Sequence, residues 1–481
     1  MLGAKLILLL AVFLRLLSSF RYFQQSFYKI KGYLAFFFKY SYTLLVPILA
    51  GLALINTDST LNFIFALMIL LHELSLLKIY KVGIKATPRF KRLCFLSLIL
   101  FPLIFFYPYL YGLLNLLVVP LFIISNCLEK IINHKYLKRA VYKRNKFKKD
   151  VIGITGSYGK TTTKLYLAHI LDLKKPFYTT KSYNTPMGIS LAINQDNLEL
   201  YDCLILEMGA TKLNDIKYLA AHFRPNIAIV TEIGAMHLNS FKKIENIAKE
   251  KMELVMSLPK DGIAILNYDN LYIKNYPLNE DIKLLSFGKT DAIYCYQLMD
   301  NDSFKVKVKD EKEYQFKHNN LSEMDISNLM PALILAFHYG LDHGYIQKQI
   351  LTLKKPKSRQ SVITYKDITI IDDSFNSNLS GALKALEKLA TYSGKKYLIT
   401  PGFVCSNAIM DASHKVYAKK IAQVCDVVYV INCPTGRNLY KYLHKAYLIS
   451  DYKLAFQLFN IVEGKRALLI ENDLPDIYED I

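Results

Sequence analysis

The feature that most constrains this chain is an apolar run over residues 94–124 that holds no charged side chain. The run is longer than the roughly 20 residues that one membrane-spanning helix needs, and Pro108 lies in its middle, so we expect two spans there. Other apolar runs are LILLLAVFLRLL near the N-terminus and the segments 43–55 and 61–77. We therefore predict four to five transmembrane helices within residues 1–127.

The first apolar run, LILLLAVFLRLL, has a cleavable signal peptide as its alternative. It carries no A-x-A-like cleavage site, it contains Arg15, and further apolar runs follow it. A membrane span is therefore the better interpretation of this run.

Basic residues are concentrated between and after the apolar runs. The chain has 61 Lys and Arg against 40 Asp and Glu, a net charge of +21, and residues 128–150 are the densest basic run. Segments 21–39 and 78–92 are also basic, and positive loops face the cytoplasm, so we expect everything after residue 128 to be cytoplasmic. Residues 128–150 are predicted to be a juxtamembrane linker beside anionic lipid headgroups. Membrane lipids are preferred to nucleic acid as the partner of this run.

Beyond residue 150 the pattern changes to short apolar strands that alternate with helical segments. Runs such as VIGIT, DCLILEMG and NIAIVTEIG are separated by helices, which is typical of parallel βαβ units. A second series of the same kind begins near residue 367. We therefore predict two α/β domains, a parallel-sheet domain over 151–355 and a Rossmann-like domain over 356–481.

Residues 153–163, GITGSYGKTTT, follow the first of these strands and open a helix. Gly156 and Gly159 let backbone N–H groups turn toward an anion, and the helix N-terminus, the lysine and a hydroxyl suit phosphates and Mg²⁺. Ile154 occupies the first-glycine position of the strict G-x4-G-K-[ST] pattern, and a glycine-rich turn without a ligand is the alternative. The context favours a phosphate-binding loop (P-loop), so 151–355 is predicted to be an ATPase-type domain.

The form TGSYGKTTT resembles the ATP-binding loop of the Mur ligases, the ATP-dependent amide-forming enzymes of peptidoglycan synthesis. Other stretches are similar to the same family in order and spacing; they are 179–193, 206–241, 245–254, 327–341 and 358–386. EMGA and DDSFNSN point to the branch that joins D-alanyl-D-alanine to UDP-N-acetylmuramoyl-tripeptide. The resemblance covers roughly residues 150–420, and with the apolar runs it implies a multi-pass protein of the bacterial inner membrane with its enzyme domains in the cytoplasm.

The resemblance implies which residues bind ATP. Lys160 would contact the β- and γ-phosphates, and Asn328 would meet the adenine. Asp373 would hold the ribose hydroxyls, with an ordinary strand-ending turn as the alternative, and Arg359 would reach the phosphates from the second domain. The expected nucleotide set is Gly156, Ser157, Gly159, Lys160, Thr161, Thr162, Asn328, Arg359 and Asp373.

The same resemblance implies a site for two Mg²⁺ ions. Thr161, Glu207 and His237 would be ligands, and a glutamate that closes an apolar strand needs a partner if it is buried. Lys251 falls where the family carries a carbamylated lysine, although by itself it looks like a solvated helix lysine. The residues expected to take part in catalysis are Lys160, His237, Lys251 and Arg359.

Three functions stay open from the sequence. The first is a D-alanyl-D-alanine-adding ligase, with UDP-muramoyl-peptide and the dipeptide as substrates. The second is a Mur-like amide ligase for another acceptor, such as a polyglutamate-type or lipid-linked precursor, because membrane spans stand where the family has its sugar-binding domain. The third is a non-catalytic membrane protein that binds nucleotide, against which the intact motif residues argue.

Overall fold

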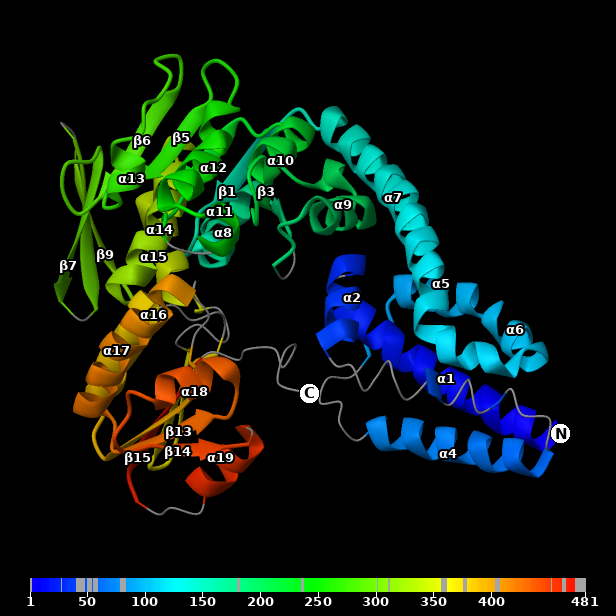
Figure 1. Cartoon of the computed structure of the whole chain (residues 1–481). Coiled ribbons are helices and arrows are strands. Elements are labelled where there is room, and N and C mark those ends of the chain that lie inside the picture. The colour runs from blue at the N-terminus through cyan, green and yellow to red at the C-terminus, as the bar shows by residue number, and fades with distance from the viewer. Residues whose placement is uncertain are drawn as a thin grey trace. The chain divides into compact units, whose positions relative to one another are not determined.

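The chain divides into two compact units, Met1–Lys135 with Pro475–Ile481, and Tyr136–Leu474. Figure 1 shows helices in the first unit and sheets flanked by helices in the second. The computed structural model describes residues 2–26, 28–39, 48–49, 54, 59–77, 84–179, 182–234, 238–300, 302–309, 312–355, 361–374, 379–402, 407–450, 452–460 and 464–471.

The first unit is built from helices. Within the described ranges they are α1 (Leu2–Gln25), α2 (Ile30–Lys39), α4 (Ser59–Leu77), α5 (Pro88–Ser97), α6 (Leu100–Phe106), the 3-10 helix η1 (Pro108–Leu113) and the beginning of α7 (Leu114–Lys146). The apolar run 94–124 breaks at Tyr107, where φ is −126° and ψ is 74°. Pro108 then begins η1, because proline lacks an N–H and is accommodated in a first helical turn.

Two helical stretches of the described residues are long and apolar enough to cross a membrane, Leu2–Gln25 and Pro108–Lys146. The apolar part of α4, Thr60–Ser75, is shorter. Most of the expected span at 43–55 lies outside the described residues. Among the described residues, two helices are therefore of spanning length where the sequence predicts four or five, since α4 is shorter and the first part of the run 94–124 forms the short helices α5 and α6.

The first unit carries large apolar side chains on its outside and polar side chains within. Leu6 and Leu10 on α1 and Met68 on α4 are exposed. The buried polar side chains of this unit include Arg15, Ser18, Ser19, Glu73, Ser97, Asn115, Ser125 and Glu129. Arg15 Nε donates to Glu73 Oε1 at 2.9 Å, and the Tyr111 hydroxyl donates to the same oxygen at 2.6 Å. This distribution is the reverse of the usual one in water.

α7 is a continuous helix of 33 residues and belongs to both units (Figure 1). The sequence predicts a linker over 128–150, but most of that segment is the second half of α7. Leu137, Ala140 and Phe147 are buried in a core cluster of the second unit. The many basic residues of this segment hide its apolar positions, which recur at helical spacing.

The larger sheet of the second unit has nine strands among the described residues, in the order β2-β3-β1-β4-β5-β6-β7-β8-β9. They are β1 (Asp150–Thr155), β2 (Pro176–Tyr178), β3 (Cys203–Glu207), β4 (Ile227–Val230), β5 (Ile263–Asn267), β6 (Lys283–Gly288), β7 (Tyr294–Asp300), β8 (Ser303–Val308) and β9 (Glu313–Lys317). Neighbours from β2 to β7 pair in parallel, and β7, β8 and β9 pair antiparallel. The carboxyl ends of the parallel strands therefore share one edge.

Helices cover both faces of this sheet. Alternate strand residues such as Ile152 and Ile205 pack against one helix layer, and Leu204 and Leu206 pack against the other. The first layer contains α8 (Lys160–Ile170), α14 (Glu323–His338) and α15 (His343–Thr352). The second contains α9 (Pro186–Gln195), α10 (Asp215–Phe223), α12 (Ile244–Met256) and the end of α7. Three short elements complete the second layer: η3 (Leu198–Leu200), α11 (Leu238–Phe241) and α13 (Leu271–Lys274). Another short element, η2 (Asp172–Lys174), follows α8.

The second sheet has six strands in the described residues, in the order β10-β11-β15-β12-β13-β14. They are β10 (Ser361–Tyr365), β11 (Ile368–Asp373), β12 (Lys395–Thr400), β13 (Val427–Ile431), β14 (Tyr447–Ile449) and β15 (Arg466–Glu471). The helices α16 (Leu379–Ala390), α17 (Asn407–Val424) and α18 (Pro434–Tyr440) pack on one face, and α19 (Tyr452–Asn460) packs on the other. The α/β class that the alternating pattern predicts is confirmed.

Candidate active site

The P-loop lies between the carboxyl end of β1 and the first turn of α8. Gly156 has a φ of 148° and Gly159 a φ of 81°, and α8 begins at Lys160. Lys160 Nζ donates to the Gly156 carbonyl at 2.7 Å and to the Ser157 carbonyl at 3.0 Å. A phosphate in the loop would offer this ammonium group a charged and therefore stronger partner than these carbonyls.

Both loop glycines are required by their surroundings. A Cβ on Gly156 would lie 2.1 Å from Thr231 Oγ1, and a Cβ on Gly159 would lie 2.3 Å from Asn328 Oδ1. Their positive φ angles are also ones that residues with a side chain rarely adopt. The glycine positions that the sequence singles out therefore have a direct steric cause.

Glu207 closes β3 and is only 1% exposed. Thr161 Oγ1 donates to its Oε2 at 3.0 Å, and Asn184 Nδ2 donates to its Oε1 at 3.1 Å. Lys164 Nζ lies 3.1 Å from Oε2. The structure thus brings Thr161 and Glu207 together, as a shared metal site requires, and it supplies the partner that a buried carboxylate needs.

Lys164 is a site residue that the sequence reasoning missed. Its side chain is 0% exposed, and Nζ also lies 3.4 Å from Thr179 Oγ1. The signal was present, because Lys164 follows Lys160 by one helical turn and precedes the apolar run from Leu165 to Leu167. A lysine on the buried face of a helix has to be paired with an acid.

Lys251 lies on α12 and is 4% exposed, whereas Lys249 is exposed. The alternative that Lys251 is a solvated helix lysine is therefore wrong. Burial, and after it the positive charge of Lys160, lower the pKa of Lys251 to about 7. Near neutral pH a large share of this side chain is the uncharged amine, which is the nucleophilic form. The neighbouring Glu250 is occupied elsewhere, since it accepts hydrogen bonds from backbone N–H groups at the start of α10.

Residues 157–162, Glu207 and Lys251 line one pocket of about 430 Å³. From the expected set it contains Ser157, Gly159, Lys160, Thr161, Thr162, Glu207, Lys251, Asn328 and Asp373. Other side chains also line it, among them Asn184, Thr185, Asp215, Tyr218, Glu232 and Lys384. Parallel strands gather these residues because their carboxyl ends meet at one edge of the sheet.

His237 and Arg359 lie outside the described residues. In the part of the chain that the structure describes, no group of three or more His, Cys, Asp or Glu side chains could hold a metal ion. Thr161 and Glu207 are hard oxygen donors, and Mg²⁺ is usually held by one or two such groups with water and phosphate oxygens. The donor set therefore fits one Mg²⁺ that is bound together with a nucleotide.

Residues 154–336 match the family model described as the Mur ligase middle domain. This part of the chain is a Mur ligase domain. Among curated relatives, the UDP-N-acetylmuramoyl-tripeptide–D-alanyl-D-alanine ligase of Buchnera aphidicola (subspecies Baizongia pistaciae) is 30% identical over 269 residues, 54% of this chain and 58% of the relative. The enzyme of the same name from Escherichia coli is 26% identical over 293 residues, 57% of this chain and 62% of the relative.

A solved structure of the MurF ligase from Thermotoga maritima in complex with ADP is similar at 25% identity, with a TM-score of 0.63, over 71% of this chain and 80% of that one. With the relatives above, it supports a likeness of this chain to the Mur ligases that carry the MurF name. The chain nevertheless spans only about three fifths of the length of these curated relatives.

Proposed function

We propose that this chain is an ATP-dependent amide ligase that joins D-alanyl-D-alanine to UDP-N-acetylmuramoyl-tripeptide in peptidoglycan synthesis. The observation that carries the proposal is the pocket in which Lys160, the Thr161–Glu207 pair and Lys251 meet. The names of the similar Buchnera and Escherichia enzymes support the choice of substrates.

The chemistry that suits such a pocket is activation of a carboxylate. The terminal carboxylate of the tripeptide attacks the γ-phosphorus of ATP, a P–O bond forms, and ADP leaves with the electron pair of the broken bond. The amine of the dipeptide then attacks the acyl carbon, the C–N bond forms, and inorganic phosphate leaves. Both steps need positive charge beside the transferring group and a fixed orientation of the two substrates.

We assign the charge on the phosphates to Lys160 and to the helix N-terminus behind it. Thr161 and Glu207 would hold Mg²⁺, which supplies further positive charge when it is bound. Lys164 fixes the Glu207 carboxylate at 3.1 Å and keeps it oriented toward Thr161. A second Mg²⁺ would need His237 and a carbamylated Lys251, for which the lowered pKa of Lys251 supplies the uncharged amine.

We assign the nucleotide to the remaining pocket residues. The backbone from Gly156 to Gly159 and the start of α8 would surround the phosphates. Asn328 on α14 is assigned to the adenine, and Asp373 at the end of β11 to the ribose. Arg359 completes the proposal from the second domain. All these roles follow the resemblance, and the shared pocket supports those of Asn328 and Asp373.

We further propose that the first unit is embedded in the bacterial inner membrane. The second unit, Tyr136–Leu474, is called the catalytic unit below, and we propose that it is cytoplasmic. The exposed leucines of α1, the buried pair of Arg15 and Glu73 and the two helices of spanning length support this. Polar groups within a bilayer face the protein interior and pair with one another. Basic side chains near the polar ends of the helices would meet anionic headgroups, so membrane lipids are the expected partners.

The test is phosphate release by the full chain in detergent or bilayers, with UDP-N-acetylmuramoyl-tripeptide present and D-alanyl-D-alanine added or omitted. We expect dipeptide-dependent release, and a loss of about 10³-fold in Lys160→Met because a charged contact to the transferring group is removed. A protein that binds ATP but shows no dipeptide-dependent release would contradict the proposed substrates. In that case the same assay with a lipid-linked muramoyl tripeptide would test the second function left open by the sequence.

A further inference from the structure

The end of α7 contacts the catalytic unit through two adjacent basic residues, Lys143 and Arg144. Leu137, Ala140 and Phe147 bury the apolar side of this segment in the core that also contains α9 and α10. Another adjacent pair, Lys138 and Arg139, lies one and a half turns earlier on the same helix and is exposed. The two Lys-Arg pairs of this helix thus differ, since one contacts the catalytic unit and the other is exposed to solvent.

Lys143 binds the carboxyl-terminal end of α9. Its Nζ donates to the carbonyl oxygens of Ile193 at 3.2 Å, Asn194 at 3.0 Å and Asp196 at 2.8 Å. The last carbonyls of a helix have no partner within the helix, and a cation there also interacts favourably with the helix dipole. Lys143 therefore fixes the end of α9 by charge and by hydrogen bonds together.

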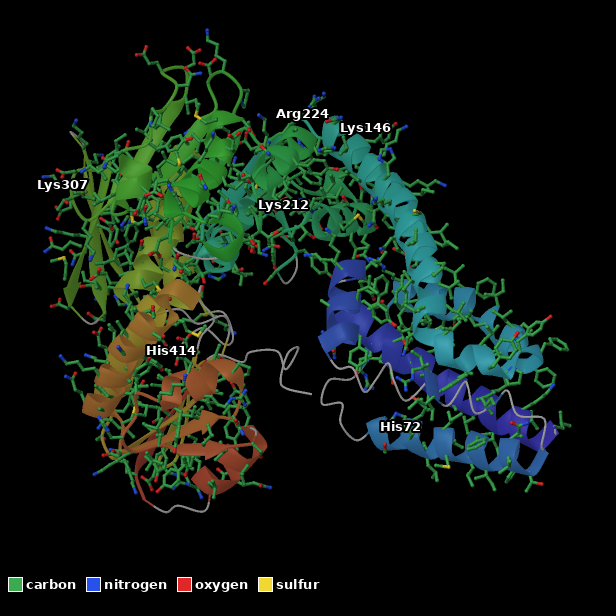
Figure 2. All side chains as sticks on the ribbon, in the orientation of Figure 1. His72, Lys146, Lys212, Arg224, Lys307 and His414 are labelled. Atoms are coloured by element: carbon green, nitrogen blue, oxygen red, sulfur yellow. The ribbon has the colours of Figure 1, made fainter. Side chains whose placement is uncertain are left out.

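Arg144 binds the end of α10 in the same way. Its Nε donates to the carbonyl of Phe223, the last residue of α10, and its Nη2 donates to the carbonyl of the C-cap residue Arg224. Its Nη1 donates to the Phe147 carbonyl at 3.3 Å. Figure 2 labels Arg224 and Lys146, which follow α10 and end α7 at this junction. α7 is thus attached to two catalytic-domain helices by neighbouring side chains.

The opposite ends of α9 and α10 line the pocket. Thr185 and Pro186 do so at the start of α9, and Asp215 and Tyr218 at the start of α10. Asn184, just before α9, donates to Glu207 Oε1. α9 has 10 residues and α10 has 9, so at 1.5 Å per residue each helix is only about 15 Å long. A displacement at one end of such a helix therefore has only a short distance to reach the pocket end.

We propose that Lys143 and Arg144 are positioning residues that set the acceptor side of the pocket from α7. They touch no part of the P-loop in their contacts above; they act through α9 and α10, whose starts form the part of the pocket beside Glu207. The inference rests on the proposed function, which gives no nucleotide or metal role to Thr185, Pro186, Asp215 or Tyr218 and so leaves this side of the pocket to the acceptor. Packed interiors have low compressibility, so a shift at one end of a short buried helix is transmitted to the other.

The P-loop should keep its position in the pocket when the contacts of Lys143 and Arg144 are removed. Ser157 N donates to the Glu232 carbonyl at 2.6 Å, and Ser157 Oγ donates to the Gly234 carbonyl at 3.0 Å. These bonds hold the P-loop against the segment after β4. Loss of the α7 contacts is therefore expected to raise KM for the acceptor and to leave KM for ATP nearly unchanged.

The experiment uses the full chain with Lys143→Met, Arg144→Met and the double substitution, and it measures KM for ATP and for the tripeptide acceptor separately. For the double variant we expect the acceptor KM to rise at least about tenfold and the ATP KM to change less than twofold, because small misplacements of a substrate cost up to 10²-fold. Lys143→Arg and Arg144→Lys should recover part of the acceptor affinity. The control is Lys138→Met with Arg139→Met, which removes the same charges from the exposed face of the same helix and should leave both KM values unchanged.

Hydrogen exchange provides a readout that does not depend on turnover. In the double variant, amide exchange should increase at 182–188 and 211–218, at the pocket ends of the two helices, and stay unchanged at 156–161. Equal rises of both KM values, or an acceptor KM within twofold of the wild type while the melting temperature falls, would overturn the positioning role. Should the wild type itself show no dipeptide-dependent turnover, the proposed function fails, and the exchange pattern still decides the positioning role.

Discussion

The two units of this chain distribute polar and apolar side chains in opposite ways. In the catalytic unit, Ile and Leu residues of the central strands are fully buried, and two buried charged side chains, Glu207 and Lys251, line the pocket. In the first unit, leucines such as Leu6 and Leu10 are exposed while Arg15 and Glu73 are buried. Since folding places side chains according to the surrounding solvent, the contrast supports the proposal that lipid surrounds the first unit.

Each unit contains a buried ion pair, Arg15–Glu73 in the first unit and Lys164–Glu207 in the catalytic unit, and these two pairs can be compared directly. Arg15→Met leaves Glu73 charged and without its cation, so we expect the helical unit to lose about 3–5 kcal/mol of stability. Lys164→Met should destabilise the catalytic unit by a similar amount, about 3–5 kcal/mol, for the same reason. Thermal unfolding followed by circular dichroism, in detergent of fixed composition, measures both effects.

The double substitutions distinguish a structural pair from a functional one. Arg15→Met with Glu73→Leu should recover most of the lost stability and keep turnover, since apolar residues replace the pair in apolar surroundings. Lys164→Met with Glu207→Leu should recover stability but abolish phosphate release. If the first double variant folds and yet loses turnover, the Arg15–Glu73 pair has a role in the reaction.

Exposed leucines provide a matched test of the two surfaces. Leu10 on α1 is 50% exposed and Leu271 in the catalytic unit is 68% exposed. If lipid surrounds α1, Leu10→Arg places a charge in hydrocarbon at a cost of about 3 kcal/mol, whereas Leu271→Arg should change stability by less than about 0.5 kcal/mol. Retention of each variant in membranes after an alkaline wash measures the difference. Equal retention would show that water reaches both leucines.

In turnover, the smallest expected effect is the pH dependence that follows from Lys251. Its pKa is lowered to about 7 in the folded protein from the ordinary lysine value of 10.5. Between these values the unfolded chain binds more protons, so this lysine makes the fold more stable as pH rises from about 7 toward 10.5. Below pH 7 each unit of pH reduces the uncharged amine about tenfold.

Turnover in bicarbonate buffer should therefore rise as pH increases from 6 to 7 and then level off. The rise should depend on added bicarbonate, because the uncharged amine is the form that becomes carbamylated. Lys251→Met serves as the control, since it should remove both the bicarbonate dependence and the stability change. A wild-type profile that is indifferent to bicarbonate would rule out the carbamylated lysine.

Much of the catalytic unit could be predicted from the sequence because its signals are local. The strand, the glycine-rich turn and the helix start of the P-loop lie within about a dozen residues. Glu207 was predicted to need a partner if buried, but the identity of that partner, Lys164, depends on which helix face turns inward. Side-chain pairs that join distant segments are set by packing, and periodicity alone does not specify them.

The first unit and its connection to the catalytic unit were harder to predict. Apolar length suggested four or five spans, but it does not show where a run breaks into short helices, as it does at Tyr107. The basic composition of 128–150 suggested a linker and concealed the core residues of α7. His237 and Arg359 lie outside the described residues, so their roles stay predictions.

The burial of Leu137, Ala140 and Phe147 has a practical consequence for producing the enzyme without detergent. A shortened chain that began at Asp150, where the first strand begins, would lack these three side chains and would leave their apolar contacts open to water. An exposed patch of that kind promotes aggregation. A version that begins at Tyr136 would retain them, so the boundary for a water-soluble enzyme lies inside α7 rather than after it.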